Sequence, residues 1–233
     1  MKVSIITLCW NHLEDVTKPF VEDILKTTGV DYEVIFVDNG SEDGTTEYLT
    51  ERLKDVPNTQ VLRLEENLRW NGGNNHGYKF ATGEYLCFIN NDVIVNDPLW
   101  LKKMVDYAEA HPKEAVGGEL VDWQPAAEWN GENIPYLNGW LIMVHRKFCE
   151  EFGVFHPAFK TPYLEDVEFC VRLRKYGWDW HVMELGLKHL GARSSYDQID
   201  MQGNANASRQ TFLKLMGKIE KDLPVEEYLS DKI

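Results

Sequence analysis

The sequence contains no long apolar run and no closely spaced cysteines. No hydrophobic stretch approaches the ~20 residues of a membrane-spanning helix, and residues 1–9 have the pattern of a strand rather than of a signal peptide. The four cysteines lie far apart without a CxxC pair, which is typical of reduced thiols in a protein core. We therefore expect a soluble, cytoplasmic protein with no membrane span.

Basic residues are also few. Lys and Arg total 24 against 38 Asp and Glu, so the formal net charge is −14. Because a phosphate backbone binds clustered basic side chains, this balance disfavours nucleic acid as the main partner. An anionic substrate would need a metal cation or a local basic group to offset the repulsion. The length of 233 residues suffices for one globular domain with a substantial core.

Strand and helix patterns alternate through the first half of the chain. Apolar and β-branched residues predict strands at 2–8, 32–37, 59–64 and 85–89, and helical spacing predicts helices at 16–25, 46–53 and 74–81. This rhythm is typical of βαβ units. We therefore predict an α/β fold with a mostly parallel central sheet flanked by helices. Ligands of such sheets bind beyond the carboxyl ends of the strands.

The second half has a less regular pattern. It predicts helices at 98–110, 146–152, 164–176 and 208–221, strands at 115–121, 136–144 and 178–183, and loops at 122–133 and 191–204. The loop at 191–204 is small and polar, and we expect it to be mobile and to close over a ligand as a lid.

One acidic residue stands directly beyond a predicted buried strand. Asp92 follows the strand at 85–89, with Asn90 and Asn91 before it. A carboxylate at a strand end can bind a hard cation such as Mg2+ or Mn2+, and the cation can clamp a diphosphate. The alternative is a strand-to-turn connection in which Asn and Asp only satisfy backbone groups.

A second acidic pair stands at the start of a predicted helix. Glu165 and Asp166 follow a loop that would deliver them to a cleft, where one of them would act as a general base. The alternative is that they only complement the helix dipole. Glu168 and Arg172 have the spacing of an ordinary surface ion pair, and we expect no catalytic role for them.

Other polar and aromatic side chains follow the strand ends. Asp38 stands where nucleotide sites often have a base-recognising carboxylate, although an Asx turn explains it equally. Trp10 would stack on a base or pack in the core. Arg69 would contact a base or phosphate, or remain a solvated charge. From its leucine neighbours alone, His189 is more often a core residue than a ligand.

Taken together, the segments resemble the family 2 glycosyltransferases of the GT-A fold, from residue 3 to about 195. The run VDNGSEDGT at 37–45 is similar, almost letter for letter, to that family's Val-Asp-[Asp/Asn]-Gly-Ser-x-Asp-Gly-Thr signature. VSIITLCWN at 3–11, NLRWNGGNNHG at 67–77 and EDVE at 165–168 resemble its first strand, its nucleotide segment and its Glu-Asp motif. In the DXD-type metal motif Asn90 replaces the first acidic residue, as in rhamnosyltransferase-like relatives.

The resemblance implies inverting transfer of a sugar from a nucleoside-diphosphate sugar to a hydroxyl of a glycan or other acceptor. A UDP-sugar is favoured, with dTDP- and GDP-sugars as alternatives. Asp166, beside Glu165, would be the general base, with its pKa raised by that neighbour and by desolvation. Across a shared cavity, Asp92 and His189 would hold Mn2+ or Mg2+. The residues implied for donor binding are Thr7, Trp10, Asn11, Asp38, Arg69, Gly72, Asn75, Asn90 and Asn91.

The resemblance also implies how the chain is divided. We expect a single domain over 1–233, with a nucleotide-sugar-binding half at 1–95, an acceptor and catalytic half at 96–200 and a C-terminal helix at 201–233. An alternative is a nucleotide-sugar-binding protein that has lost catalysis, in keeping with Asn90. A dinucleotide-binding dehydrogenase is disfavoured because GxGxxG does not follow the first strand.

Overall fold

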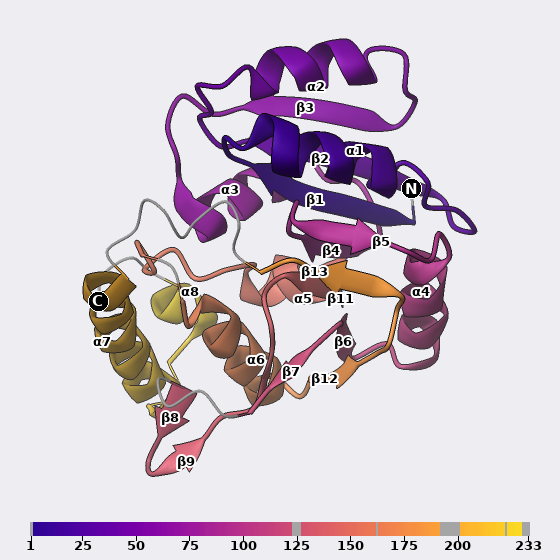
Figure 1. Ribbon diagram of the computed structural model, residues 1–233. Helices are drawn as coiled ribbons and strands as arrows, with labels where there is room; N and C mark the ends of the chain where they lie inside the picture. The colour runs from indigo at the N-terminus through magenta and orange to yellow at the C-terminus, as the bar shows by residue number, and fades with distance from the viewer. Residues whose placement is uncertain (1, 123–126, 162, 192–200, 222, 230–233) are drawn as a thin grey trace.

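A seven-stranded sheet with the order β12-β6-β11-β4-β1-β2-β3 forms the centre of the computed structural model, which describes residues 2–122, 127–161, 163–191, 201–221 and 223–229 (Figure 1). Its strands are β1 (Val3–Cys9), β2 (Tyr32–Asp38), β3 (Thr59–Arg63), β4 (Tyr85–Ile89), β6 (Glu114–Gly117), β11 (Leu141–His145) and β12 (Asp179–Val182). β11 runs against β4 and β6, whereas the other neighbours pair in parallel. The predicted α/β fold with a mostly parallel sheet is confirmed.

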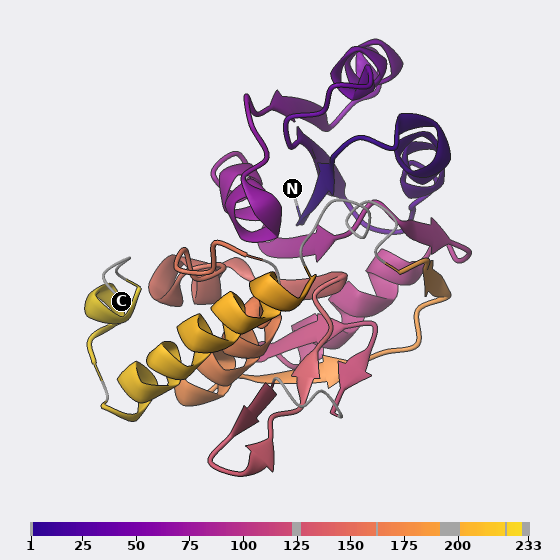
Figure 2. The ribbon, with the colours of Figure 1, turned by 60° about the vertical axis from the view of Figure 1, so that its left-hand side comes forward.

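Helices cover both faces of this sheet (Figures 1 and 2). One face packs on α1 (Lys18–Ile24), α2 (Thr45–Leu53) and α4 (Trp100–Ala110), and the other on α3 (Arg69–Tyr78), α5 (Arg146–Phe152) and α6 (Glu165–Lys175). α7 (Met201–Glu220) lies beside α6, and α8 (Val225–Tyr228) follows it. Because side chains alternate along a strand, β1 contributes Ile6 to one core and Ile5 to the other.

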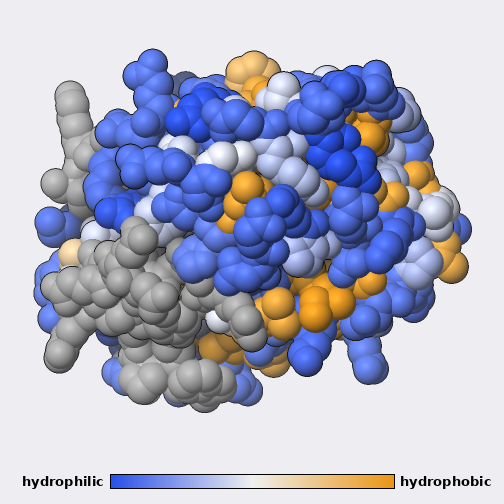
Figure 3. Space-filling view, turned by 45° about the horizontal axis from the view of Figure 1, so that its top comes forward, coloured by the Kyte–Doolittle hydropathy of each residue, from blue (hydrophilic) through white to orange (hydrophobic). Residues whose placement is uncertain are grey.

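The surface agrees with the acidic, polar composition. In the view of Figure 3 hydrophilic residues predominate, and hydrophobic residues occur in small groups. Among the residues that the structure describes, no helix combines the length and the apolar character needed to cross a membrane. All four cysteines are buried and free, as predicted.

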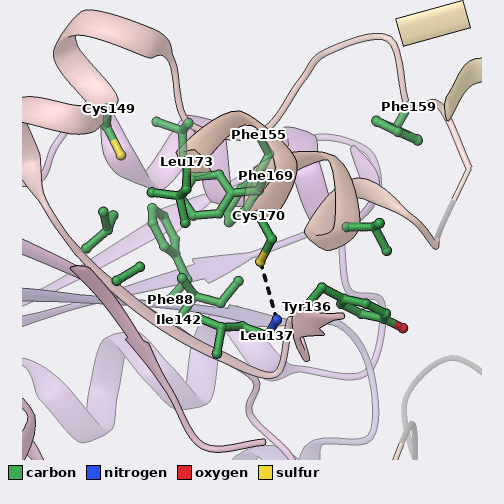
Figure 4. Packing of buried hydrophobic residues seen from close by; sticks show 14 of the residues in the cluster. Phe88, Tyr136, Leu137, Ile142, Cys149, Phe155, Phe159, Phe169, Cys170 and Leu173 are labelled. Atoms are coloured by element: carbon green, nitrogen blue, oxygen red, sulfur yellow. Dashed lines mark hydrogen bonds between the residues drawn. The ribbon is translucent and has the colours of Figure 1, made fainter. Parts of the chain in front are cut away.

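Helix α6 is fixed to the sheet through one apolar side (Figure 4). Phe169, Cys170 and Leu173 belong to the same buried cluster as Phe88 and Ile142 of the sheet. Cys170 also accepts a hydrogen bond at its Sγ atom from the backbone N–H of Leu137, at 3.3 Å (Figure 4). These contacts determine where the first turn of α6 lies relative to the end of β4.

Several predicted boundaries are wrong. α3 begins at Arg69 rather than Asn74, because close packing on β1 overrides the poor helix propensity of its Asn and Gly residues. The close approach of α3 to β1 also requires glycine at position 73, since a Cβ atom there would lie 2.8 Å from the Leu8 side chain. The predicted final helix begins at Met201 rather than Ser208, so the loop expected at 191–204 is in part helical. Residues 192–200 of that loop lie outside the described residues.

The predicted strands of the second half are shorter than expected. The run 136–144 is broken by a turn into β10 (Tyr136–Leu137) and β11, and the run 115–121 into β6 and β7 (Leu120–Val121). The predicted loop at 122–133 contains the hairpin of β8 (Glu128–Trp129) and β9 (Glu132–Asn133). The π-helix η1 (Leu13–Thr17) and the paired strands β5 (Val93–Val95) and β13 (Leu187–His189) were not predicted.

The interpretation of Glu168 and Arg172 as a surface pair is wrong. Both side chains are completely buried, and the Arg172 guanidinium donates to both Glu168 carboxylate oxygens, at 2.7 and 3.0 Å. Spacing along a helix shows that two side chains are neighbours, but not which way their side of the helix faces. Here Tyr228 of α8 and the backbone of residues 152–154 cover the pair.

Candidate active site

A short turn at 138–140 brings the two predicted acidic segments together. The backbone N–H of Gly139 donates to Oδ2 of Asp166 at 3.1 Å. One residue later, the carbonyl of Trp140 accepts from the backbone N–H of Asn90 at 2.9 Å. This proximity follows from the antiparallel register of β11 and β4, which sets Leu141 opposite the last residue of β4.

Asp92 and His189 are in contact although 97 positions separate them in the chain. The β5–β13 ladder sets His189 opposite Val93, and the N–H of Leu190 donates to the carbonyl of Asp92 at 2.9 Å. As a result, Nε2 of His189 lies 3.2 Å from Oδ1 of Asp92. The imidazole also stacks on the indole of Trp140, with ring centroids 5.2 Å apart and an angle of 14°.

The pair Asp92 and His189 fits a divalent cation. Nε2 of His189 is buried, and despite its closeness to Asp92 it makes no hydrogen bond within the described ranges. A carboxylate oxygen and a deprotonated imidazole nitrogen 3.2 Å apart are a donor pair that Mn2+ can bind, and the carboxylate also suits Mg2+. No group of three or more His, Cys, Asp or Glu side chains able to hold an ion is found in the described part. A cation here would therefore take its remaining ligands from water and a bound diphosphate.

The backbone before the Glu-Asp pair has an unusual conformation. Tyr163 and Leu164 have φ angles of 84° and 71°, in the left-handed region that bulky residues rarely adopt. Such conformations cost free energy and are concentrated at functional sites. Here they start α6 directly at Glu165, so that Asp166 in its first turn faces the 138–140 turn.

Both carboxyl groups of this pair have altered acidity. Asp166 is partly exposed as a residue, yet its carboxyl lies deep enough that burial raises its pKa, while N–H groups of Gly139 and Val167 oppose the rise. The direction agrees with the prediction and burial is its cause, whereas the expected contribution from the charge of Glu165 is absent. Burial and the charge of Asp166 raise the pKa of Glu165, whose Oε2 is buried and without a hydrogen-bond partner among the described residues.

Trp70 and Gly139 are site residues that the motif analysis missed. The indole N–H of Trp70 donates to Oδ1 of Asn90 at 3.0 Å. A Cβ atom on Gly139 would lie 3.4 Å from the Trp70 ring and 3.3 Å from Oδ2 of Asp166. Trp70 thus lies between the metal motif and the predicted base. The sequence signal that could have identified Trp70 is an aromatic residue within an Asn- and Gly-rich run.

Two predicted donor-binding residues, Asp38 and Asn11, are engaged in holding loops. Asp38 is fully buried, and its carboxylate accepts from the Ser41 N–H at 2.9 Å, from Arg63 at 3.0 Å and from the Thr46 hydroxyl. Asn11 accepts at Oδ1 from the Glu42 N–H at 3.0 Å, and its own N–H donates to Ser41 Oγ at 2.9 Å. Together they join the loops after β1 and β2.

Thr7, Trp10 and Asn91 lie at or near the ends of β1 and β4. Thr7 is buried, and its hydroxyl has no hydrogen-bond partner within the described residues. Trp10 is half-buried at the end of β1. Asn91 is 5% exposed and donates to the Thr17 hydroxyl at 3.3 Å, which places its amide under the site rather than in it.

Arg69, Gly72 and Asn75 line a separate hollow of about 360 Å3 between α3 and residues 157–160. Arg69 is exposed there. Both polar ends of the Asn75 side chain bind Phe155, because Nδ2 donates to its carbonyl at 2.8 Å and Oδ1 accepts from its N–H at 3.1 Å. The catalytic and metal candidates do not line this hollow.

Solved structures share this architecture. The mannosyltransferase PcManGT from Pyrobaculum calidifontis, in complex with GDP-Man and Mn2+, superimposes with a TM-score of 0.65 at 19% identity, covering 79% of this chain and 55% of that one. TarS 1-349 of S. aureus in complex with UDP gives a TM-score of 0.61 at 21% identity, with 79% and 58% covered. At these identities the likeness establishes the fold, in agreement with the predicted GT-A architecture.

Sequence comparison shows the family. The O-antigen biosynthesis protein RfbC of Myxococcus xanthus is 35% identical over 121 residues, which are 52% of this chain but only 9% of RfbC. The chain thus corresponds to a small part of that relative. The model of the family "Glycosyl transferase family 2" matches residues 4–161, and this span includes the signature at 37–45, Asn90, Asp92 and the 138–140 turn. The chain therefore belongs to glycosyl transferase family 2.

Proposed function

We propose that the chain catalyses inverting transfer of a sugar from a nucleoside-diphosphate sugar to an acceptor hydroxyl, with Asp166 as the general base. The observation that carries the proposal is the single turn at 138–140, which contacts both Asp166 and the Asn90–Asp92 segment. A base and a cation site on either side of one turn suit a reaction between a hydroxyl and a diphosphate sugar. In such a reaction, deprotonation and departure of the leaving group occur at neighbouring atoms.

The proposed role of Asp166 is to accept the proton of the acceptor hydroxyl. Its two oxygens receive N–H groups from Gly139 and Val167, which fix the direction of the carboxylate. Burial raises its pKa, so the ionised form is a stronger base than an exposed Asp, while its partial exposure leaves room for an acceptor. Glu165 next to it is buried, and its raised pKa favours a neutral carboxyl that adds no second charge.

Asp92 and His189 would hold Mn2+ or Mg2+, which supplies positive charge to a diphosphate leaving group. Asn90 offers no carboxylate to a cation, and its amide oxygen already accepts from Trp70. We therefore propose that Asn90 contributes to donor binding and not to the metal site. Trp140 keeps the His189 ring in its orientation by stacking on it.

The donor we propose is a UDP-sugar. The complex of TarS with UDP, a structure of similar fold, supports it, whereas the complex of PcManGT with GDP-Man makes a GDP-sugar the first alternative. Of the residues predicted to bind the donor, Thr7, Trp10 and Asn90 lie at the strand ends beside the site, and we propose that they contact the donor. Asn11, Asp38 and Asn91 would support it by holding the loops and the strand end. Arg69, Gly72 and Asn75 would contact it only if it extends into the separate hollow that they line. The name of RfbC, an O-antigen biosynthesis protein, supports a glycan acceptor. Placement in a rhamnosyltransferase-like branch rests on Asn90 alone.

Asp166→Asn tests the proposal. The variant keeps the size of the side chain and its oxygen acceptor but lacks the base, so we expect transfer to be abolished while UDP binding, measured by calorimetry, stays within about twofold. Asp179→Asn, at an exposed Asp of β12 paired with Arg174, is the matched control and should transfer at the wild-type rate. Lost UDP binding in Asp166→Asn would instead assign Asp166 to the structure or to the ligand.

The second candidate is a nucleotide-sugar-binding protein without catalysis. It is favoured by the metal motif, in which one position is an Asn whose oxygen is already bonded. An assay of donor hydrolysis separates the two, because a competent site leaks sugar to water and a pure binding site does not.

A further inference from the structure

The C-terminal helix α8 reaches the helix that carries the proposed base. Tyr228, the last residue of α8, is 2% exposed, and its hydroxyl donates to Oε1 of Glu168 at 2.6 Å. Glu168 lies in the first turn of α6, two positions after Asp166. The hydroxyl of Tyr228 therefore contacts the same turn of helix as the catalytic candidate, although 62 positions separate Tyr228 from Asp166.

Glu168 belongs to a network that ties α6 to the segment before it. Arg172 donates to both Glu168 oxygens, and its guanidinium also donates to the carbonyls of Phe152, Gly153 and Val154, at 2.6, 2.7 and 2.5 Å. Although burial opposes ionisation, the Arg172 charge and the hydrogen bonds from Arg172 and Tyr228 hold the pKa of Glu168 below its ordinary value. The network is thus a charged, fully bonded unit inside the apolar core.

The backbone of Tyr228 makes a second connection, in this case toward α3. Its carbonyl accepts from Nε2 of His156 at 2.8 Å, and Nδ1 of His156 accepts from the Ala158 N–H at 3.1 Å. Burial lowers the pKa of His156, which agrees with a neutral ring that donates at Nε2 and accepts at Nδ1. His156 is thereby fixed in both its ring orientation and its tautomer.

Residues 155–159 in turn bind α3. Asn75 makes two hydrogen bonds to the backbone of Phe155, and Asn71, 4% exposed, donates to the carbonyls of His156 and Phe159 at 3.2 and 3.4 Å. α3 also carries Trp70, which bonds to Asn90. Tyr228 therefore stands where two chains of contacts meet, one leading to the base and one to the metal motif.

We propose that Tyr228 is a positioning residue, which sets the first turn of α6 and the start of α3 relative to each other across the site. This rests on the proposed function, because it assigns the residue to the alignment of the base with the donor. Tyr228 touches no proposed substrate, and its contribution passes through Glu168 and through His156. Displacements of about 1 Å at a reacting centre cost on the order of a hundredfold in rate. A looser anchor is therefore expected to affect turnover more than donor binding.

Tyr228→Phe tests this, because it removes the hydroxyl and keeps the ring. We expect kcat to fall about tenfold or more, with the KM for the nucleotide sugar and the calorimetric affinity for UDP within about twofold. The matched control is Tyr107→Phe on α4, which removes a similar hydroxyl-to-Glu bond of 2.7 Å at Glu114, away from the site. This control should leave kcat unchanged. All assays belong well below the melting temperature of each variant.

Hydrogen exchange of peptides covering residues 163–170 gives a readout that needs no transfer. We expect faster exchange there in Tyr228→Phe and the wild-type rate in Tyr107→Phe. If exchange and kcat in Tyr228→Phe both equal the wild-type values, the positioning role is wrong. The same holds if kcat and UDP affinity fall together. A wild-type protein that binds UDP and transfers no sugar would overturn the proposed function instead, while the exchange result would still decide whether Tyr228 anchors α6.

Discussion

At the scale of single residues, Gly139 is the position where the proposed base and the Trp70 ring both approach the backbone. Its N–H holds Asp166, and the space on its Cα is limited by Oδ2 of Asp166 at 3.3 Å and by the Trp70 ring at 3.4 Å. A methyl group fits there only if one of these neighbours moves by a few tenths of an ångström. The neighbour that moves would be either the proposed base or the side chain that holds Asn90.

We therefore expect Gly139→Ala to lower kcat by about tenfold to a hundredfold while changing the free energy of unfolding by less than about 1 kcal/mol. Gly217→Ala in α7 is the control, since a Cβ atom there meets nothing within 4 Å. Steady-state kinetics and urea unfolding of both variants give the answer. Wild-type kcat in Gly139→Ala would show that Asp166 tolerates displacement and is not positioned by this turn.

The raised pKa values of the Glu165 and Asp166 carboxyl groups make the stability of the chain depend on pH. Because their folded-state pKa values are raised, the folded chain binds protons more tightly than the unfolded chain. Stability is therefore lost as pH rises from the ordinary carboxyl range through the raised values. The variant Glu165→Gln has no titrating carboxyl at position 165, so it avoids the loss of stability that this group causes as pH rises. Relative to wild type, we expect it to gain on the order of 1 kcal/mol at pH 8 and little at pH 4, by urea unfolding. A difference independent of pH would mean that the pKa of Glu165 is not raised.

Some residue roles were predictable because a side chain's chemistry is read directly from its identity. The predicted neighbourhood of Asp92 and His189 is present, and the 138–140 turn contacts both Asp166 and Asn90. A cavity shared by Asp166 and Asp92 stays a prediction. The engagement of Asn75 was not predictable, because its partner is the backbone of Phe155, eighty positions away. Motifs identify side chains, but they do not show which of their polar atoms are already bonded.

At the scale of elements, the strands of the first half were predictable because their local pattern and their burial agree. β5 and β13 were missed for the opposite reason: each is only three residues long, too short for a local pattern, and its partner lies about 90 positions away in the chain. That short ladder is nonetheless what brings His189 to Asp92. For α6 the periodicity of the sequence predicted the helix. It did not show which sides of the helix other elements cover, and so it did not predict the burial of Arg172.

The burial of Arg172 makes a quantitative prediction. Arg172→Met leaves the Glu168 carboxylate and three backbone carbonyls without their donor in the core, and we expect a loss of about 3–5 kcal/mol in the free energy of unfolding. The matched control is Arg52→Met, which breaks a similar two-bond pair with Glu22 at the surface and should cost less than about 1 kcal/mol. Urea unfolding of both decides, and equal losses would contradict the burial of the pair.

At the scale of the whole molecule, the net charge of −14 opposes the binding of anionic ligands. A nucleoside diphosphate is itself anionic, so a strongly acidic protein repels it unless a local charge intervenes. The polar residues beyond β1, β2 and β4 provide hydrogen bonds but little positive charge. In the proposed function Asp92 and His189 would supply the missing positive charge, because a bound cation would reverse the local sign of the potential.

This balance predicts that UDP binding depends on a divalent cation and on Asp92. We expect UDP affinity with Mn2+ to weaken by about 1.5–3 kcal/mol, the scale of a lost charge-assisted contact, when EDTA is added or when Asp92 is changed to Ala. The two losses should not add, since both remove the same ion. Asp106→Ala on α4, an exposed carboxylate paired with Lys102, is the control and should keep wild-type affinity and its full response to EDTA. Calorimetry of the three proteins with and without EDTA measures this. If wild-type affinity does not change on chelation, the acidic chain offsets the diphosphate charge without a metal, and the role given to Asp92 and His189 is wrong.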